Sequence, residues 1–179
     1  MDDDAATIRG AMDGDPDAFR ILVERYSRSV FRLAYRLTRS RQDADDIVQE
    51  AFLRAYRNLH AFDGRSSFGT WLYRIAANSA FDMMRSAQRH PTEELGERDV
   101  PSPVAKEPAT QIGIRAAVES AMKLLSGNER TAFVLRHFEG MSIDEISEVL
   151  GIEPNAVKNT IFRAVRKLRE VLAPLVRPA

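Results

Sequence analysis

Residues 142–170 read SIDEISEVLGIEPNAVKNTIFRAVRKLRE and contain the strongest structural pattern in the chain. Ser142 and Glu145 fit a capping box, in which two side chains satisfy free backbone donors at the start of a helix. Gly151 then follows a short apolar-periodic run, and Pro154 falls at the first position of a longer helix. A short helix, a glycine turn and a basic helix together predict a helix-turn-helix.

Apolar residues of both helices and of the turn are expected to pack the motif together: Ile146, Leu150, Ile152, Val157 and Ile161. The other face of the longer helix is polar and basic. Basic side chains on the other face can neutralise phosphates, and Asn or Arg can read base edges in a major groove. The alternative is a helical hairpin with a solvated charged face. The positions predicted to meet DNA are Asn155, Lys158, Asn159, Phe162, Arg163, Arg166 and Lys167.

A second capping box, Ser126 with Glu129, marks another helix start, and helical periodicity resumes just before it, from Ile114 to Leu125. Residues 113–179 are therefore predicted to form a small helical domain. Residues 91–112 lack periodicity, carry four prolines and are acidic, which predicts a flexible linker.

Residues 1–90 form the other predicted domain. Asp15-Pro16 begins a long amphipathic helix, a second one follows with Asp43, Asp45 and Asp46 in its first turn, and a third runs from Trp71 to Met84 after a turn-like segment at 62–67. No convincing strand pattern occurs. The fold class expected is all-α, with two small helical domains.

Composition excludes several classes of function. The chain has 26 basic and 26 acidic residues, no cysteine, and three histidines without metal-ligand spacing. No glycine-rich phosphate loop occurs, so neither a catalytic site, a metal site nor a cofactor is expected. The chain opens Met-Asp-Asp-Asp and contains no long apolar stretch, which predicts neither a signal peptide nor membrane insertion.

Three groups of residues resemble one family. DIVQEAF at 46–52, FGTWLYRIAAN at 68–78, and the helix-turn-helix with Val157-Lys158 and Phe162-Arg163-Ala164 resemble the bacterial extracytoplasmic-function (ECF) sigma factors. The resemblance implies a cytoplasmic, non-enzymatic initiation factor that docks on core RNA polymerase, recognises two promoter elements and opens the DNA. It also implies control by an anti-sigma factor.

The resemblance assigns roles to residues of the N-terminal domain. Asp46, Gln49 and Glu50 would bind the clamp of the largest β-type polymerase subunit; the polymerase flap is a further expected contact. The residues expected at the proximal promoter element and in melting are Phe62, Arg65, Ser66, Ser67, Trp71, Arg74 and Asn78. A core position is the favoured alternative for Trp71, and the alternatives for Phe62 and Asn78 are sealing the helical core and capping or spacing helices.

Two other functions stay open at this point. One is a helix-turn-helix transcriptional regulator that binds duplex DNA alone, and the other is a sigma-like decoy that occupies an anti-sigma factor. The 46–50 and 71–78 groups favour the sigma factor over the regulator, and the basic C-terminal helix favours it over the decoy.

Overall fold

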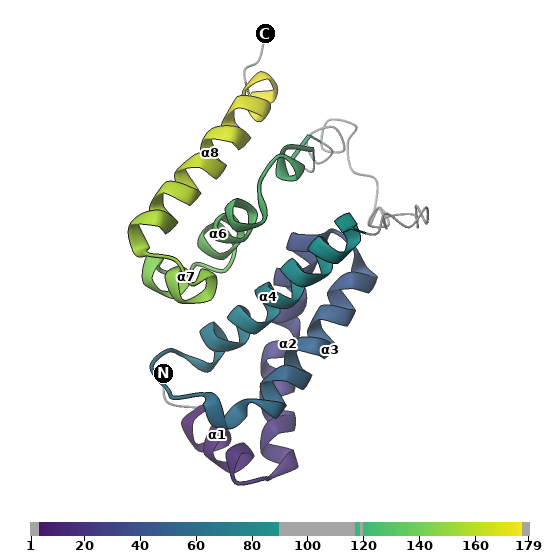
Figure 1. Cartoon of the computed structure of the whole chain (residues 1–179), viewed down its shortest axis with the longest axis vertical. Coiled ribbons are helices and arrows are strands. Elements are labelled where there is room, and N and C mark those ends of the chain that lie inside the picture. The colour runs from purple at the N-terminus through teal and green to yellow at the C-terminus, as the bar shows by residue number, and fades with distance from the viewer. Residues whose placement is uncertain (1–3, 90–116, 119, 177–179) are drawn as a thin grey trace. The chain divides into compact units, whose positions relative to one another are not determined.

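The computed structural model describes residues 4–89, 117–118 and 120–176, which divide into two compact units. Every regular element in these ranges is a helix, as the sequence predicts (Figure 1). The linker predicted at 91–112 lies outside the described residues. Within the described ranges, no helix is both long and apolar enough to cross a bilayer.

The N-terminal unit is a bundle of α2 (Pro16–Thr38), α3 (Arg41–Arg57) and α4 (Phe68–Arg89), each packed against the other two (Figure 1). Its core is mainly aliphatic, with Phe52, Phe68 and Trp71 also buried, because the apolar stripes of the three helices face one another. The side chains with no exposed surface include Leu22, Val30, Leu33, Leu37, Ala44, Ile47, Ala51, Ala55, Leu72 and Ala77.

The helix starts of this unit follow the sequence closely. Asp15 caps α2 by accepting from the Asp17 backbone N–H at 2.9 Å, with Pro16 at the first position. Ser40 caps α3 by accepting from the Asp43 N–H at 3.1 Å. Polar caps of this kind satisfy donors that the helix itself leaves free, which fixes where each helix begins.

One helix of this unit is not predicted from the sequence. α1 (Asp4–Met12) contacts α2 and the short 3₁₀ turn η1 (Leu59–Ala61), and it buries Ile8 and Ala11. The Asp4 carboxylate accepts hydrogen bonds from Arg25 and from the Tyr26 hydroxyl. These contacts join the start of the chain to the middle of α2.

The C-terminal unit contains the predicted helix-turn-helix. α6 (Gly127–His137) and α7 (Ile143–Leu150) both begin with complete capping boxes, at Ser126 and Ser142, and α8 (Pro154–Val176) packs on both helices. Gly151 ends α7 with φ 63°, a left-handed conformation that only glycine adopts without cost. The turn is held by the Ile152 carbonyl, which accepts from the Ser147 hydroxyl at 2.5 Å.

The core of this unit differs in detail from the one predicted. Ile146 and Val157 are fully buried as expected, whereas Leu150, Ile152 and Ile161 are half-buried, and Val149 takes a core position that was not predicted. A second cluster joins α8 to the segment before α6; it consists of Ala121, Leu125, Ala164 and Leu168. This cluster and the α7 contacts hold α8 on two sides.

Candidate functional site

The exposed face of α3 displays the residues predicted to contact the polymerase. Asp46 and Gln49 are exposed one turn apart, while Glu50 is half-buried and accepts a hydrogen bond from Arg54 Nε at 2.5 Å. Glu50 is therefore already engaged within the helix, and Asp46 and Gln49 are the more accessible pair.

Apolar side chains continue this α3 face beyond Gln49. Leu53 is 44% exposed and Tyr56 is 53% exposed, and the Tyr56 ring meets that of Phe19 with centroids 4.9 Å apart. Leu53 lies four positions after Gln49 and Tyr56 lies seven, so one face of the helix carries all three side chains. Leu53 and Tyr56 are not among the residues predicted from the sequence, although their spacing from Gln49 was the available signal.

The start of α4 carries an aromatic cluster. The Phe62 ring lies 5.4 Å from Trp71 and 5.8 Å from Phe68, measured between centroids, and Trp71 itself is only 8% exposed. Trp71 thus occupies the core position given above as its alternative. Phe62 is half-buried on these two rings, which anchors the loop that precedes α4.

The loop residues predicted at the proximal promoter element separate into different roles. Ser67 caps α4, because its hydroxyl accepts from the Thr70 N–H at 3.0 Å. Arg65 is exposed and pairs with Asp63 at 3.1 Å, and Ser66 is half-buried. Arg65 is therefore the loop side chain with most freedom to meet a ligand.

Arg74 and Asn78 lie on the exposed side of α4 and line a depression of about 320 Å³. The edge of Trp71 reaches the same depression, but Phe62, Arg65, Ser66 and Ser67 do not line it. Its other lining residues are Arg54, Asn58, Ala61 and Ile75.

Arg54 and Asn58 were missed by the sequence analysis. They are four residues apart, Arg54 in α3 and Asn58 at the C-cap of that helix, as Arg74 and Asn78 are in α4, so two arginines and two amides line the depression. The repeated Arg-x-x-x-Asn spacing was the available signal. Guanidinium and amide groups together suit a ligand with phosphates and base edges.

On α8 the predicted row of DNA-contacting residues is exposed almost throughout. Asn155, Lys158 and Asn159 are exposed near its start, and Phe162 is 67% exposed one turn later. The opposite side of this helix is buried, at Val157, Thr160, Ala164 and Leu168. α8 is therefore fixed by one face and presents the other, with Arg163 and Arg166 continuing the exposed row.

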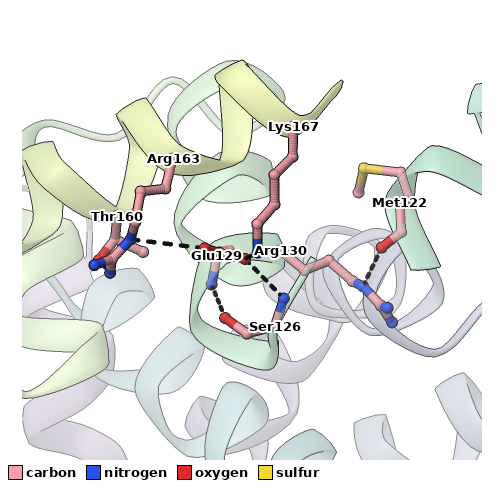
Figure 2. A network of polar contacts seen from close by, with 7 residues as sticks. All are labelled: Met122, Ser126, Glu129, Arg130, Thr160, Arg163 and Lys167. Carbon is pink, nitrogen blue, oxygen red and sulfur yellow. Dashed lines mark hydrogen bonds and ion pairs between the residues drawn. The ribbon is translucent and has the colours of Figure 1, made fainter. Parts of the chain in front are cut away.

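Lys167 departs from that row. It is half-buried, and its ammonium donates to Glu129 Oε2 at 2.7 Å, across from α8 to the start of α6 (Figure 2). Burial alone raises the pKa of Glu129, but the hydrogen bonds from Lys167 and from the Ser126 N–H outweigh burial, so the pKa lies below its ordinary value. Lys167 thus serves an ion pair inside the unit.

The geometry defines a class of protein: a two-unit helical protein whose C-terminal unit carries a helix-turn-helix with an exposed basic helix, an arrangement typical of DNA-binding proteins, and whose N-terminal unit presents a polar depression and a partly apolar face. The Sigma-70 region 2 family model matches residues 22–90, and the Sigma-70, region 4 model matches residues 115–168. The chain belongs to the ECF sigma factors, which give RNA polymerase its promoter specificity.

Curated relatives match along nearly their whole length. The chain is 35% identical to the RNA polymerase sigma-H factor of Pseudomonas aeruginosa, over 100% of this chain and 98% of the relative. It is 35% identical to the ECF sigma factor SigW of Bacillus subtilis, over 94% and 96%. Two sigma regions on one chain confirm the sigma factor over a simple helix-turn-helix regulator.

Solved structures show the same fold. CnrH, solved in complex with the cytosolic domain of CnrY, is 29% identical with a TM-score of 0.72, and the likeness covers 96% of this chain and 97% of CnrH. The sigma factor RpoE of Bartonella quintana, solved in complex with the anti-sigma factor NepR, is 21% identical with a TM-score of 0.69, over 87% and 96%. The all-α, two-domain fold is thereby confirmed.

Proposed function

We propose that this sigma factor divides promoter work among three surfaces: the α3 face for core polymerase, the α3–α4 depression for an unpaired promoter base, and the exposed row of α8 for the upstream element. The observation that carries the proposal is the burial pattern of α8, where a fixed apolar face backs a row of basic and amide side chains. The protein acts in the bacterial cytoplasm and catalyses no reaction of its own.

The depression is suited to a base because melting exposes a base that the duplex hides. Extruding a base costs a few kcal/mol of stacking and pairing, which a protein that opens DNA without ATP must offset. Asn78 offers an amide donor and acceptor, and Arg74 offers charge for the phosphates. Arg54 is paired with Glu50 and Asp82, and the Asn58 amide donates to the Arg54 carbonyl at 2.8 Å, so these two side chains shape the depression from within the fold. Phe62 contributes by holding the loop on Trp71 rather than by lining the depression.

A protein partner that restrains the factor forms the regulatory part of the proposal. CnrH, which shares the fold at 29% identity, is seen bound to the cytosolic domain of another protein. An anti-sigma factor that covers the α3 face would compete with polymerase for Asp46, Gln49 and the exposed Leu53 and Tyr56.

Run-off transcription with core polymerase over a promoter library tests the function as a whole. The full chain should direct transcription from a defined subset of promoters and give none without core polymerase. A decoy would bind an anti-sigma factor yet start no transcripts, and that result would contradict the proposal.

Exchange of Asp46 and Gln49 for alanine should lower affinity for core polymerase by about tenfold, which corresponds to about 1.4 kcal/mol. Both side chains are exposed, so the free energy of unfolding should change by less than about 0.5 kcal/mol. Titration of labelled double variant with core polymerase measures the affinity. Glu24→Ala, which removes an exposed carboxylate of α2 outside the three proposed surfaces, is the matched control, and equal affinity of the double variant and this control would contradict the assignment.

Asn78→Ala should slow promoter opening on duplex DNA by about tenfold, because one amide contact to a base discriminates by roughly 1–3 kcal/mol. A fluorescent base analogue in the non-template strand reports opening by the holoenzyme. A pre-melted bubble should restore only part of the rate, since the base contact itself is missing. If the double variant with Asn78→Ala and Asn58→Ala opens duplex promoters at the normal rate, the depression does not bind the unpaired base.

A further inference from the structure

Glu129 is a buried carboxylate that connects the start of α6 to the middle of α8. Its side chain is 7% exposed, and Oε2 accepts both from the Ser126 backbone N–H at 2.9 Å and from Lys167 Nζ at 2.7 Å. The other oxygen, Oε1, lies 3.6 Å from Arg163 Nε (Figure 2). One carboxylate therefore completes a capping box and meets two cations of α8 that are one turn apart.

The second capping box shows that a cap does not require these cations. Glu145 has the same position in its box and accepts from the Ser142 N–H at 2.8 Å. No basic side chain of residues 120–176 for which the structure gives contacts pairs with Glu145, whereas two pair with Glu129. The contacts of Glu129 to α8 are thus an addition to capping.

Arg163 is the member of this network that also belongs to the exposed row. Its side chain is 56% exposed, Nε faces Glu129, and Nη2 donates to the Thr160 hydroxyl at 3.2 Å. Thr160 is buried at 3% exposure, so neither anchor can move freely. The hydrogen bond at Nη2 and the ion pair beside Nε together restrict the orientation of the guanidinium, so less rotamer freedom remains to be lost when it binds.

We propose that Glu129 is a positioning residue for DNA recognition: it orients the Arg163 guanidinium, and thereby sets how sharply α8 discriminates one base of the upstream element. The inference rests on the proposed function of α8. Glu129 itself stays behind the helix and touches no DNA. Lys167 donates to Glu129 and holds the carboxylate in place, whereas the neighbouring basic side chains of Arg166 and Arg169 are exposed.

The test measures base preference rather than affinity alone. The full chain, assembled with core polymerase, selects from promoters whose upstream region is randomised, and sequencing of the selected DNA gives a preference ratio at each position. Arg163→Ala should abolish the base preference at one position of the upstream element. Glu129→Gln should lower the ratio at that same position by about 3- to 10-fold, in the range of coupling between contacting residues.

A double-mutant comparison separates positioning from general loss of structure. In the Arg163→Ala background, Glu129→Gln should change no ratio further, because the group it orients is gone. Thr160→Val removes the other anchor with little change in shape and should reproduce the flattening even if Glu129→Gln folds poorly. Glu145→Gln, the matched cap variant, should leave every ratio unchanged.

Each failure has its own pattern. If Arg163→Ala alters no ratio, the proposed role of α8 at that position fails, and the inference fails with it. If Arg163→Ala flattens a position but Glu129→Gln and Thr160→Val do not, only the positioning role is overturned. If Glu129→Gln lowers the preference ratio equally in the natural chain and in the Arg163→Ala background, the positioning role is also overturned.

Discussion

Trp71→Ala is expected to lower the free energy of unfolding of the N-terminal unit by about 3–5 kcal/mol, the usual cost of removing a buried large aromatic side chain. Trp71 is 8% exposed, and its ring centroid lies 5.4 Å from Phe62 and 5.6 Å from Phe68. The substitution would open a cavity under the loop at 62–67. Urea unfolding of the full chain followed by circular dichroism measures the change.

Two further variants test whether Trp71 is a core residue. Asn78→Ala lies two turns further along the same helix and should shift the unfolding free energy by no more than about 0.5 kcal/mol, since Asn78 is exposed. Trp71→Phe should recover much of the loss by refilling the cavity. An unfolding midpoint of Trp71→Ala equal to that of Asn78→Ala would contradict the core assignment.

The helices that the sequence predicted are those with both a periodic apolar stripe and a polar cap. α2, α7 and α8 begin where Asp15-Pro16, Ser142 and Pro154 predict, because caps and periodicity are local properties. α1 was missed for the opposite reason. It is short, buries only Ile8 and Ala11, and is held by the contacts of Asp4 with α2, which no local pattern contains.

The candidate site was predicted where exposure follows from helical position. Asp46, Gln49, Asn155 and Lys158 are exposed as their spacing requires. Arg54 and Asn58 were missed because the depression forms only when α3 and α4 pack together.

Lys167 was placed among the DNA contacts because its charge resembles that of its neighbours. Its actual direction depends on Glu129, which lies 38 positions earlier in the chain. Pairing at that separation is a tertiary property, which spacing along one helix does not reveal.

Lys167→Met is expected to destabilise the C-terminal unit by about 2 kcal/mol at neutral pH. Breaking a fully buried ion pair costs about 3–5 kcal/mol, and the smaller figure reflects that Lys167 is 38% exposed and that Arg163 stays 3.6 Å from Glu129. Methionine keeps the aliphatic contacts of the lysine stem. The single tryptophan, Trp71, reports the N-terminal unit, so the C-terminal transition is the loss of circular dichroism without a change in fluorescence.

The pH dependence of the free energy of unfolding shows whether the Lys167–Glu129 ion pair causes this destabilisation. In the natural chain the lowered pKa of Glu129 means that its contribution to stability is present above the ordinary carboxyl pKa and is lost as pH falls through the lowered one. Without Lys167, the pKa of Glu129 should lie higher than in the natural chain because the lysine no longer favours the charged form, so the variant should lose less stability on acidification and the gap between the two proteins should narrow. Lys158→Met, an exposed lysine on the same helix, should show no gap at any pH. Glu129→Gln combined with Lys167→Met removes both charges and should be more stable at neutral pH than Lys167→Met alone, because no buried carboxylate is left with only the longer contact to Arg163. A gap of constant size from neutral to acidic pH would show that the methionine acts through packing and not through the ion pair.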